Sequence, residues 1–278
     1  MNTLSIPEAN FMQTYAATID ELQPSQWLHY CQLVQQVQAG TISWDDFEVS
    51  FLYNLLNLKP TKKGGEDKVM NVTLLRETLR GFYDFSDKDP DKRYIQTETV
   101  LNLLPQFEWE GENYTGPGVL LHDITFGTFL QAYQVYGDYC KSENPDALTY
   151  MVAILYSNGQ PFPFREKALD KLPIHYGLAN FFFFRSCVEH LTTKPIIVHG
   201  NEIPVHEVFE TSGSGKSTQK VNPLGLETVL FDLGEIGVFG NTQELKQQNL
   251  FEVLRYLWNK HTKNQEENRK ANAERTRS

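Results

Sequence analysis

The chain has 278 residues, and 25 Lys and Arg against 35 Asp and Glu give it a formal charge of −10. Hydrophobic residues make up 40% of the chain and aromatic residues 13%. Burying these side chains can offset the conformational entropy lost on folding, so a chain that is disordered throughout is excluded. The 18 Gly, 13 Pro and 3 Cys exclude collagen-like and disulfide-framework chains. The acidic balance argues against nucleic acid as the main partner.

The sequence also bears on the compartment. Its N-terminus lacks a basic region followed by an apolar core, so no signal peptide is expected. The most apolar stretch, residues 178–188, is short and contains Arg185, whereas a membrane span needs about 20 apolar residues. The three cysteines lie far apart, which is typical of free thiols in a reducing compartment. We therefore expect a cytoplasmic protein without a membrane span.

Residues 1–85 are predicted to form an N-terminal helical region. Apolar side chains recur at helical spacing from Phe11 to Leu22, and again from Trp27 to Val37. Ser43 is a plausible N-cap for a third helix that carries an apolar stripe to Leu58. A fourth helix is expected around residues 74–82.

Residues 86–210 are predicted to form a helical core with short hairpins. Apolar and polar residues alternate over residues 107–114 and a Gly-Pro-Gly turn follows, which indicates a strand or hairpin. Helices are expected from Phe129 and from Asn144, and the most apolar helix runs over residues 174–191. That helix carries four consecutive phenylalanines, so it should be the buried centre of the fold.

The rest of the chain divides into a flexible loop at 211–224, a C-terminal helical pair at 225–262 and a disordered or frayed tail at 263–278. Residues 259–278 hold six basic and three acidic side chains, a net charge of +3, so the other 258 residues carry −13. The sequence as a whole predicts a mainly α fold with short β-hairpins (α+β), as one packed multi-helix domain with a solvated C-terminal tail.

A phosphate-binding loop is the most conspicuous motif. Residues 212–218 read SGSGKST and end as a Walker A loop does, with Gly-Lys-Ser. However, Glu210 occupies the leading glycine position, and its carboxylate would repel phosphate. Pro223 and Gly225 also interrupt the helix that should follow. A flexible surface loop is the favoured interpretation, and a nucleotide site is retained as an alternative.

A calcium loop is the second alternative. Asp87, Asp89, Asp91 and Glu98 occupy positions 1, 3, 5 and 12 of an EF-hand-like stretch. Lys92 stands where the sharp turn needs glycine, and neighbouring basic residues offset the negative charge. A polar interhelical loop is therefore favoured over a calcium site.

No catalytic, metal or cofactor site is assigned. His199 and His206 lie on a predicted hairpin with glutamates nearby, but zinc needs three or four ligands at tight spacing. Cys187 and His190 lie one turn apart, yet the helix that carries them is expected to be buried, which would leave the thiol inert. The sequence therefore favours a non-enzymatic protein.

Four short apolar and glycine-containing strings occur in the second half of the chain, at residues 121–129, 171–184, 225–241 and 249–254. Their order resembles a family of proteins encoded among the tail genes of tailed phages and prophages, and the resemblance spans roughly residues 98–258. Members of that family look like tail-assembly chaperones, helical proteins that protect the long tape-measure protein before the tail tube polymerises. The resemblance implies a non-enzymatic role in the bacterial cytoplasm and offers no catalytic residues.

A protein that binds a long helical partner needs apolar grooves between its own helices to receive the apolar face of that partner. Aromatic-rich helices could supply them, although any one such side chain is more often part of the core. The candidate partner-binding residues are Phe126, Phe129, Tyr133, Tyr136, Phe239, Phe251 and Leu254.

Overall fold

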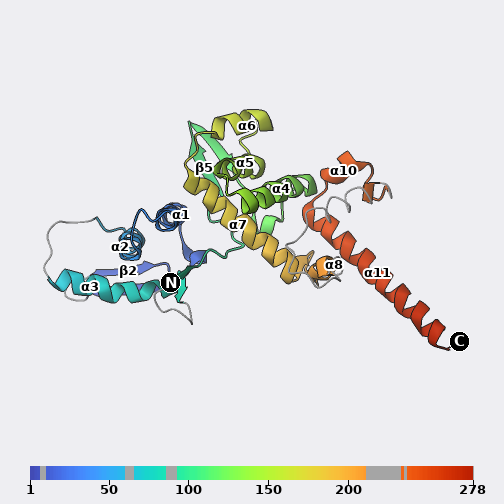
Figure 1. The fold of residues 1–278 in the computed structure, drawn as a ribbon, viewed down its shortest axis with the longest axis horizontal. Helices are drawn as coiled ribbons and strands as arrows, with labels where there is room; N and C mark the ends of the chain where they lie inside the picture. Colours follow the sequence, from blue (N-terminus) through green and yellow to red (C-terminus); the bar gives the residue numbers. More distant parts are fainter. Residues whose placement is uncertain (7–10, 60–65, 86–92, 211–232, 235–236, 278) are drawn as a thin grey trace.

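A computed structural model describes residues 1–6, 11–59, 66–85, 93–210, 233–234 and 237–277, and the account below is confined to them. The fold is mainly helical (Figure 1), with four two-stranded antiparallel hairpins among the described residues. The prediction of a mainly α fold with short β-hairpins is therefore confirmed. Within the described ranges, no helix combines the length and the apolar character that a membrane crossing requires.

The N-terminal region begins with a hairpin rather than a helix. Asn2 pairs with Tyr15 in antiparallel register, so the helical prediction for residues 11–22 is wrong. The buried side chains of Tyr15, Ile19 and Leu22 fit helical spacing, but a strand followed by a 3-10 turn buries the same three. The elements are β1 (Asn2–Ile6), β2 (Phe11–Tyr15) and η2 (Ile19–Glu21).

The next helices form an aromatic core around Tyr30. Its ring centroid lies 4.9 Å from that of Phe51, and its hydroxyl is within 2.7 Å of the carbonyl oxygen of Phe82. Ser43 caps the second helix as predicted, by accepting a hydrogen bond from the backbone N–H of Asp46. The elements are α1 (Pro24–Gln38), α2 (Trp44–Leu55), α3 (Glu66–Arg76), η3 (Glu77–Gly81), β3 (Tyr83–Phe85) and β4 (Arg93–Ile95).

The middle of the chain packs around one buried helix, α7 (Figure 1). Phe182 contacts Trp27 of α1, with ring centroids 6.2 Å apart. Phe184, on another face of α7, contacts Phe129 of α4, with ring centroids 5.8 Å apart. The prediction that the four phenylalanines lie at the centre is confirmed. The elements are β5 (Gln106–Trp109), β6 (Glu112–Thr115), η4 (Val119–Leu121), α4 (Phe126–Ser142), α5 (Pro145–Leu155), α6 (Phe162–Leu169) and α7 (Ile174–Thr193).

The C-terminal part adds a hairpin and a long helix. The hairpin turns at His199 and Gly200, both with positive φ, as a two-residue turn requires. The long helix starts against the body, where the N–H of Leu250 donates to the carbonyl oxygen of Ile124 at 3.0 Å. The elements are β7 (Ile196–Val198), β8 (Asn201–Ile203), α8 (His206–Glu210), α10 (Thr242–Lys246) and α11 (Leu250–Arg277).

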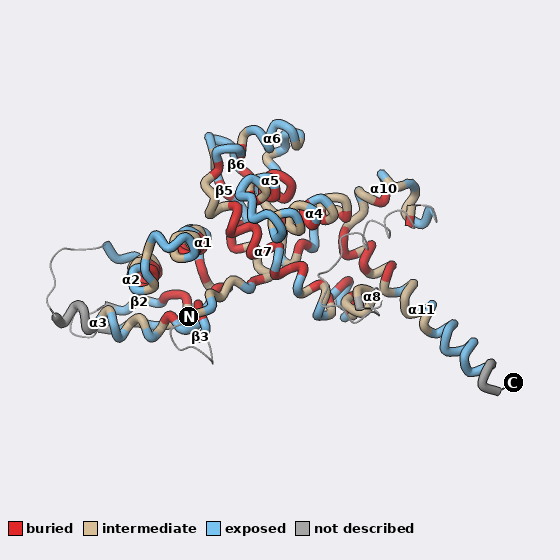
Figure 2. The backbone as a smooth tube through the Cα atoms, viewed as in Figure 1, coloured by how far each residue is buried: buried red, intermediate tan, exposed pale blue. Residues whose placement is uncertain are grey.

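The C-terminal tail differs from its prediction. Residues 263–277 were expected to be disordered or frayed, but they continue α11 without a break. Figure 2 shows this distal part as mostly exposed, so the expected solvation of the tail is confirmed while its disorder is not. Lys, Glu, Gln, Arg and Ala are good helix formers, and they carry the helix beyond its last buried turn.

The predicted domain boundaries stay predictions, but one of them meets a structural difficulty. A boundary between residues 85 and 86 would separate β3 from β4, which pair with each other through Asp84 and Tyr94. The predicted loop at 211–224 lies outside the described residues, as does most of residues 225–236.

Candidate interaction surfaces

Four of the candidate partner-binding residues come from α4. Phe126, Phe129 and Tyr133 are buried, and Tyr136 is half-buried. Two of the four rings pack on α7: Phe129 lies 5.8 Å from Phe184 and Tyr136 lies 5.5 Å from Phe181, between centroids. Burial raises the pKa of the Tyr133 and Tyr136 hydroxyls to about 12. These side chains belong to the core or pack against it, instead of lining an open groove.

The other three candidates belong to the C-terminal part. Leu254 and Phe251 are both buried, on the first turns of α11. Phe239 is half-buried, and its ring meets the edge of Tyr256 at 5.3 Å. The backbone N–H of Phe126 donates to Gln248 at 2.8 Å, which joins this group to α4. The structure therefore brings the two groups into one packed unit, and partner binding by them stays a prediction.

A cleft of about 370 Å³ lies between the N-terminal region and the C-terminal half of α7. Its buried polar residues are Thr99 and Ser186, and the backbone N–H of Thr99 donates to the Ser186 hydroxyl at 3.1 Å. Three exposed acidic residues from separate parts of the chain line the cleft, together with one lysine. The cleft is lined by Asp20, Glu98, Thr99, Val100, Ser186, Glu189, His190, Thr193 and Lys194.

The structure shows the surroundings of both members of the candidate pair Cys187 and His190. His190 lines the cleft, and its Nε2 lies 3.3 Å from the carbonyl oxygen of Pro195. Cys187 is fully buried, and burial raises the pKa of its thiol far above the ordinary value. A thiol held in its neutral form is a poor nucleophile, so the geometry does not favour covalent catalysis here.

The candidate metal ligands His199 and Glu98 lie in different parts of the structure. His199 lies on the hairpin turn and contacts Glu252 of α11 through Nε2 at 2.7 Å. Across the described ranges, no group of three or more His, Cys, Asp or Glu side chains is arranged to hold a metal ion. Glu98 lines the cleft, whereas Asp87, Asp89 and Asp91 of the predicted calcium loop lie outside the described residues, as does the 212–218 loop.

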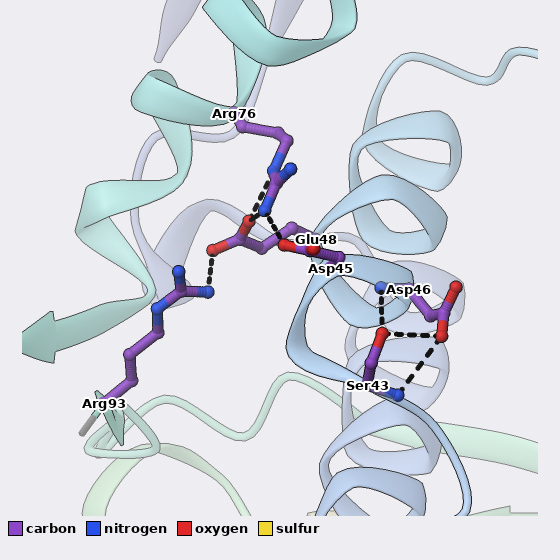
Figure 3. A network of polar contacts seen from close by, with 6 residues as sticks. All are labelled: Ser43, Asp45, Asp46, Glu48, Arg76 and Arg93. Carbon is purple, nitrogen blue, oxygen red and sulfur yellow. Dashed lines mark hydrogen bonds and ion pairs between the residues drawn. The ribbon is translucent and has the colours of Figure 1, made fainter. Parts of the chain in front are cut away.

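A buried carboxylate forms a network in the N-terminal region (Figure 3). Glu48 of α2 is 2% exposed and pairs with Arg76 of α3 and Arg93 of β4. Arg76 also pairs with the exposed Asp45. The Arg93 guanidinium lies 5.5 Å from the ring centroid of Trp44, a cation–π contact. Because every member ties one element to another, this network serves the fold.

The distal half of α11 is the most prominent surface feature of the chain. It runs away from the rest of the molecule in Figure 1, and most residues from Asn259 onward are exposed. It holds no apolar side chain larger than alanine after Trp258. Sequence reasoning predicted helix up to residue 262 and missed its continuation because the distal part lacks an apolar stripe, although its composition of helix-forming residues was a usable signal.

Comparisons with known proteins bring no relative for this chain. It matches no model of a protein family, no curated protein and no solved structure.

Proposed function

We propose that this chain is a non-enzymatic, chaperone-like protein of tailed-phage or prophage tail assembly that binds a long helical partner. The observation that carries the proposal is the meeting of three of the four resemblance strings in one packed unit. Residues 121–129 lead into α4, residues 171–184 lead into and include the first half of α7, and residues 249–254 include the start of α11. Phe129 and Phe184 join the first two strings, with ring centroids 5.8 Å apart.

Half-buried aromatic side chains at the edge of this unit support the proposal further. Four of them pack against the core yet remain partly exposed to solvent: Tyr136, Phe239, Tyr256 and Trp258. Aromatic side chains of this kind supply large contact areas to a partner helix.

Co-expression with a tape-measure protein tests the proposal. A tailed-phage tape-measure protein expressed alone should be insoluble, and when co-expressed with the full chain it should stay soluble and co-elute with it. A Tyr136→Ala, Phe239→Ala double variant should retain much less of it. Phe164→Ala removes an aromatic ring that is 67% exposed on α6, away from the proposed surface, and should retain it fully.

Two results would overturn the proposal. One is a tape-measure protein that precipitates to the same extent with and without this chain. The other is a clear rise in the melting temperature with Mg-ATP or with Ca²⁺, since stabilisation by a ligand would favour the nucleotide- or calcium-dependent alternative.

A further inference from the structure

The turn between α5 and α6 carries an asparagine followed by a glycine. Among all the asparagines of the sequence, only Asn158 precedes a glycine, Gly159. Glycine has no side chain, so it leaves its backbone nitrogen open to close approach. That nitrogen can reach the side-chain amide carbon of the preceding asparagine and close a five-membered ring. The pair is therefore a candidate site of covalent self-modification.

The turn leaves room for such a ring to close. A Cβ atom added to Gly159 would meet nothing within 4 Å. Gly159 is exposed and Asn158 is half-buried. The positive φ of Gly159 belongs to a tight turn, and residues 158–160 lie outside every helix and strand. In Figure 1 the following helix, α6, lies at the outer edge of the molecule. Steric protection by the surrounding fold is thus small.

The hydrogen bonds of the turn favour attack on the amide. The backbone N–H of Gln160 donates to Oδ1 of Asn158 at 3.1 Å. This donor can stabilise the negative charge that develops on Oδ1 when a nucleophile adds to the amide carbon. The N–H of Gly159 donates to the hydroxyl of Ser157 at 3.2 Å. Since that acceptor is an exposed side chain, loss of the proton breaks no backbone hydrogen bond of the fold.

We propose that Asn158 is a site of spontaneous deamidation through a cyclic imide. The nitrogen of Gly159 gives its proton to hydroxide and attacks the side-chain amide carbon of Asn158. The new C–N bond forms as the bond to the amide nitrogen breaks, and ammonia leaves with a proton taken from water. Water then opens the imide at either carbonyl carbon, which yields aspartate or isoaspartate. The site lies outside the surface of the proposed function, so neither depends on the other.

Isoaspartate changes the joint that holds α6. Before the turn, Ser157 and Thr115 of β6 exchange two backbone hydrogen bonds of 2.8 and 2.9 Å. After it, the guanidinium of Arg165 on α6 donates to the carbonyl oxygens of Gln160 and Ala153. In isoaspartate the main chain runs through the former side chain and gains one methylene group between these two anchors. The modified chain should therefore hold α6 less tightly.

Mass spectrometry of the native full chain tests the site. After incubation at pH 8 in water enriched in oxygen-18, the peptide that contains Asn158 should exchange its amide for a carboxyl group with one labelled oxygen. Aspartate and isoaspartate products of equal mass should separate by chromatography. At pH 6 the conversion should be about tenfold slower or more, because hydroxide removes the proton of the attacking nitrogen less often.

Two variants and an internal control sharpen the test. Asn158→Gln should lose the reaction, since glutamine would have to close a larger ring. Gly159→Ala should lose most of it, because the added methyl group shields the nitrogen, and circular dichroism confirms that the variant folds. Asn201 is exposed on the hairpin of β7 and β8 but precedes Glu202, so it should stay unconverted over the same time.

Hydrogen exchange measures the effect on α6. The amide hydrogens of residues 162–169 should exchange faster in the purified isoaspartate form than in the unmodified chain. Those of α7 should exchange equally in both forms, because α7 is the buried helix of the fold. Equal exchange of α6 in the two forms would overturn the inferred loosening of this helix.

Three outcomes would overturn the proposed site. The native chain could stay unconverted over a time in which the chain unfolded in guanidinium chloride is converted, which would mean that the fold protects Asn158. Aspartate could form without isoaspartate, which would mean direct hydrolysis instead of a cyclic imide. Asn201 could convert as fast as Asn158, which would mean that exposure alone decides the rate.

Discussion

Gly177 of α7 lies directly against Leu148 of α5. A Cβ atom added to Gly177 would come within 2.7 Å of the Leu148 Cβ and 3.2 Å of its carbonyl carbon. The two helices therefore approach so closely that only a residue without a side chain fits between them. This contact fixes α5 on the buried helix around which the middle of the fold packs.

Gly177→Ala should destabilise the protein although alanine is the better helix former. The added methyl group meets backbone as well as side-chain atoms, and overpacking of this kind costs about 1–3 kcal/mol. We expect the free energy of unfolding from urea denaturation to fall accordingly. Gly137→Ala on α4, where a Cβ would meet nothing within 4 Å, should raise it by about 0.5–1 kcal/mol. Equal effects of the two substitutions would contradict the close contact.

Glu48 should matter far more than its neighbour Asp45. Glu48→Ala leaves Arg76 and Arg93 without the buried carboxylate that both contact, and breaking a buried ion pair costs about 3 kcal/mol. Asp45 is 75% exposed, and an exposed pair is worth at most about 1 kcal/mol. Urea denaturation of the two alanine variants measures the difference. A smaller loss for Glu48→Ala than for Asp45→Ala would show that the network does not hold the region.

Local sequence patterns predicted the fold correctly where a helix buries a single stripe of apolar side chains. The helices from Trp27, Trp44, Phe129 and Ile174 follow from apolar spacing and capping residues alone. The helical prediction for residues 11–22 was wrong because the strand that pairs with β2 lies earlier in the chain. The spacing of side chains within one segment carries no information about such pairing. The sequence therefore predicts helices here better than it predicts which segments pair.

The interaction surfaces were less predictable than the fold. Phe126 and Phe129 were chosen for their aromatic character, but that character is also what places them in the core. The cleft was invisible in the sequence because Asp20, Glu98 and Glu189 are far apart along the chain. Only the tertiary arrangement brings these three carboxylates together.

Two histidines should make the stability depend on pH. Partial burial lowers the pKa of His29 on α1, and burial followed by the charge of His29 lowers that of His175 on α7. Their neutral forms are thus favoured in the folded state. The stability that they contribute is complete above the unfolded value near 6.5 and is lost as the pH falls through the folded pKa.

The free energy of unfolding should consequently be lower at pH 5 than at pH 7. Replacing both His29 and His175 by glutamine should reduce this difference, since glutamine takes up no proton. His122→Gln, which alters an exposed side chain, should leave the difference unchanged. Urea denaturation at the two pH values measures it. An undiminished difference in the double variant would assign the dependence to other groups.

The three thiols should differ sharply in reactivity. Cys31 and Cys187 are fully buried, and burial raises the pKa of both thiols well above the ordinary value, so neither offers a thiolate. Cys140 on α4 is exposed. A thiol reagent that releases a coloured product should therefore label one cysteine per native chain and three after denaturation. Cys140→Ser should remove the native reaction, and fast labelling of Cys187 in that variant would mean that α7 is not buried in solution.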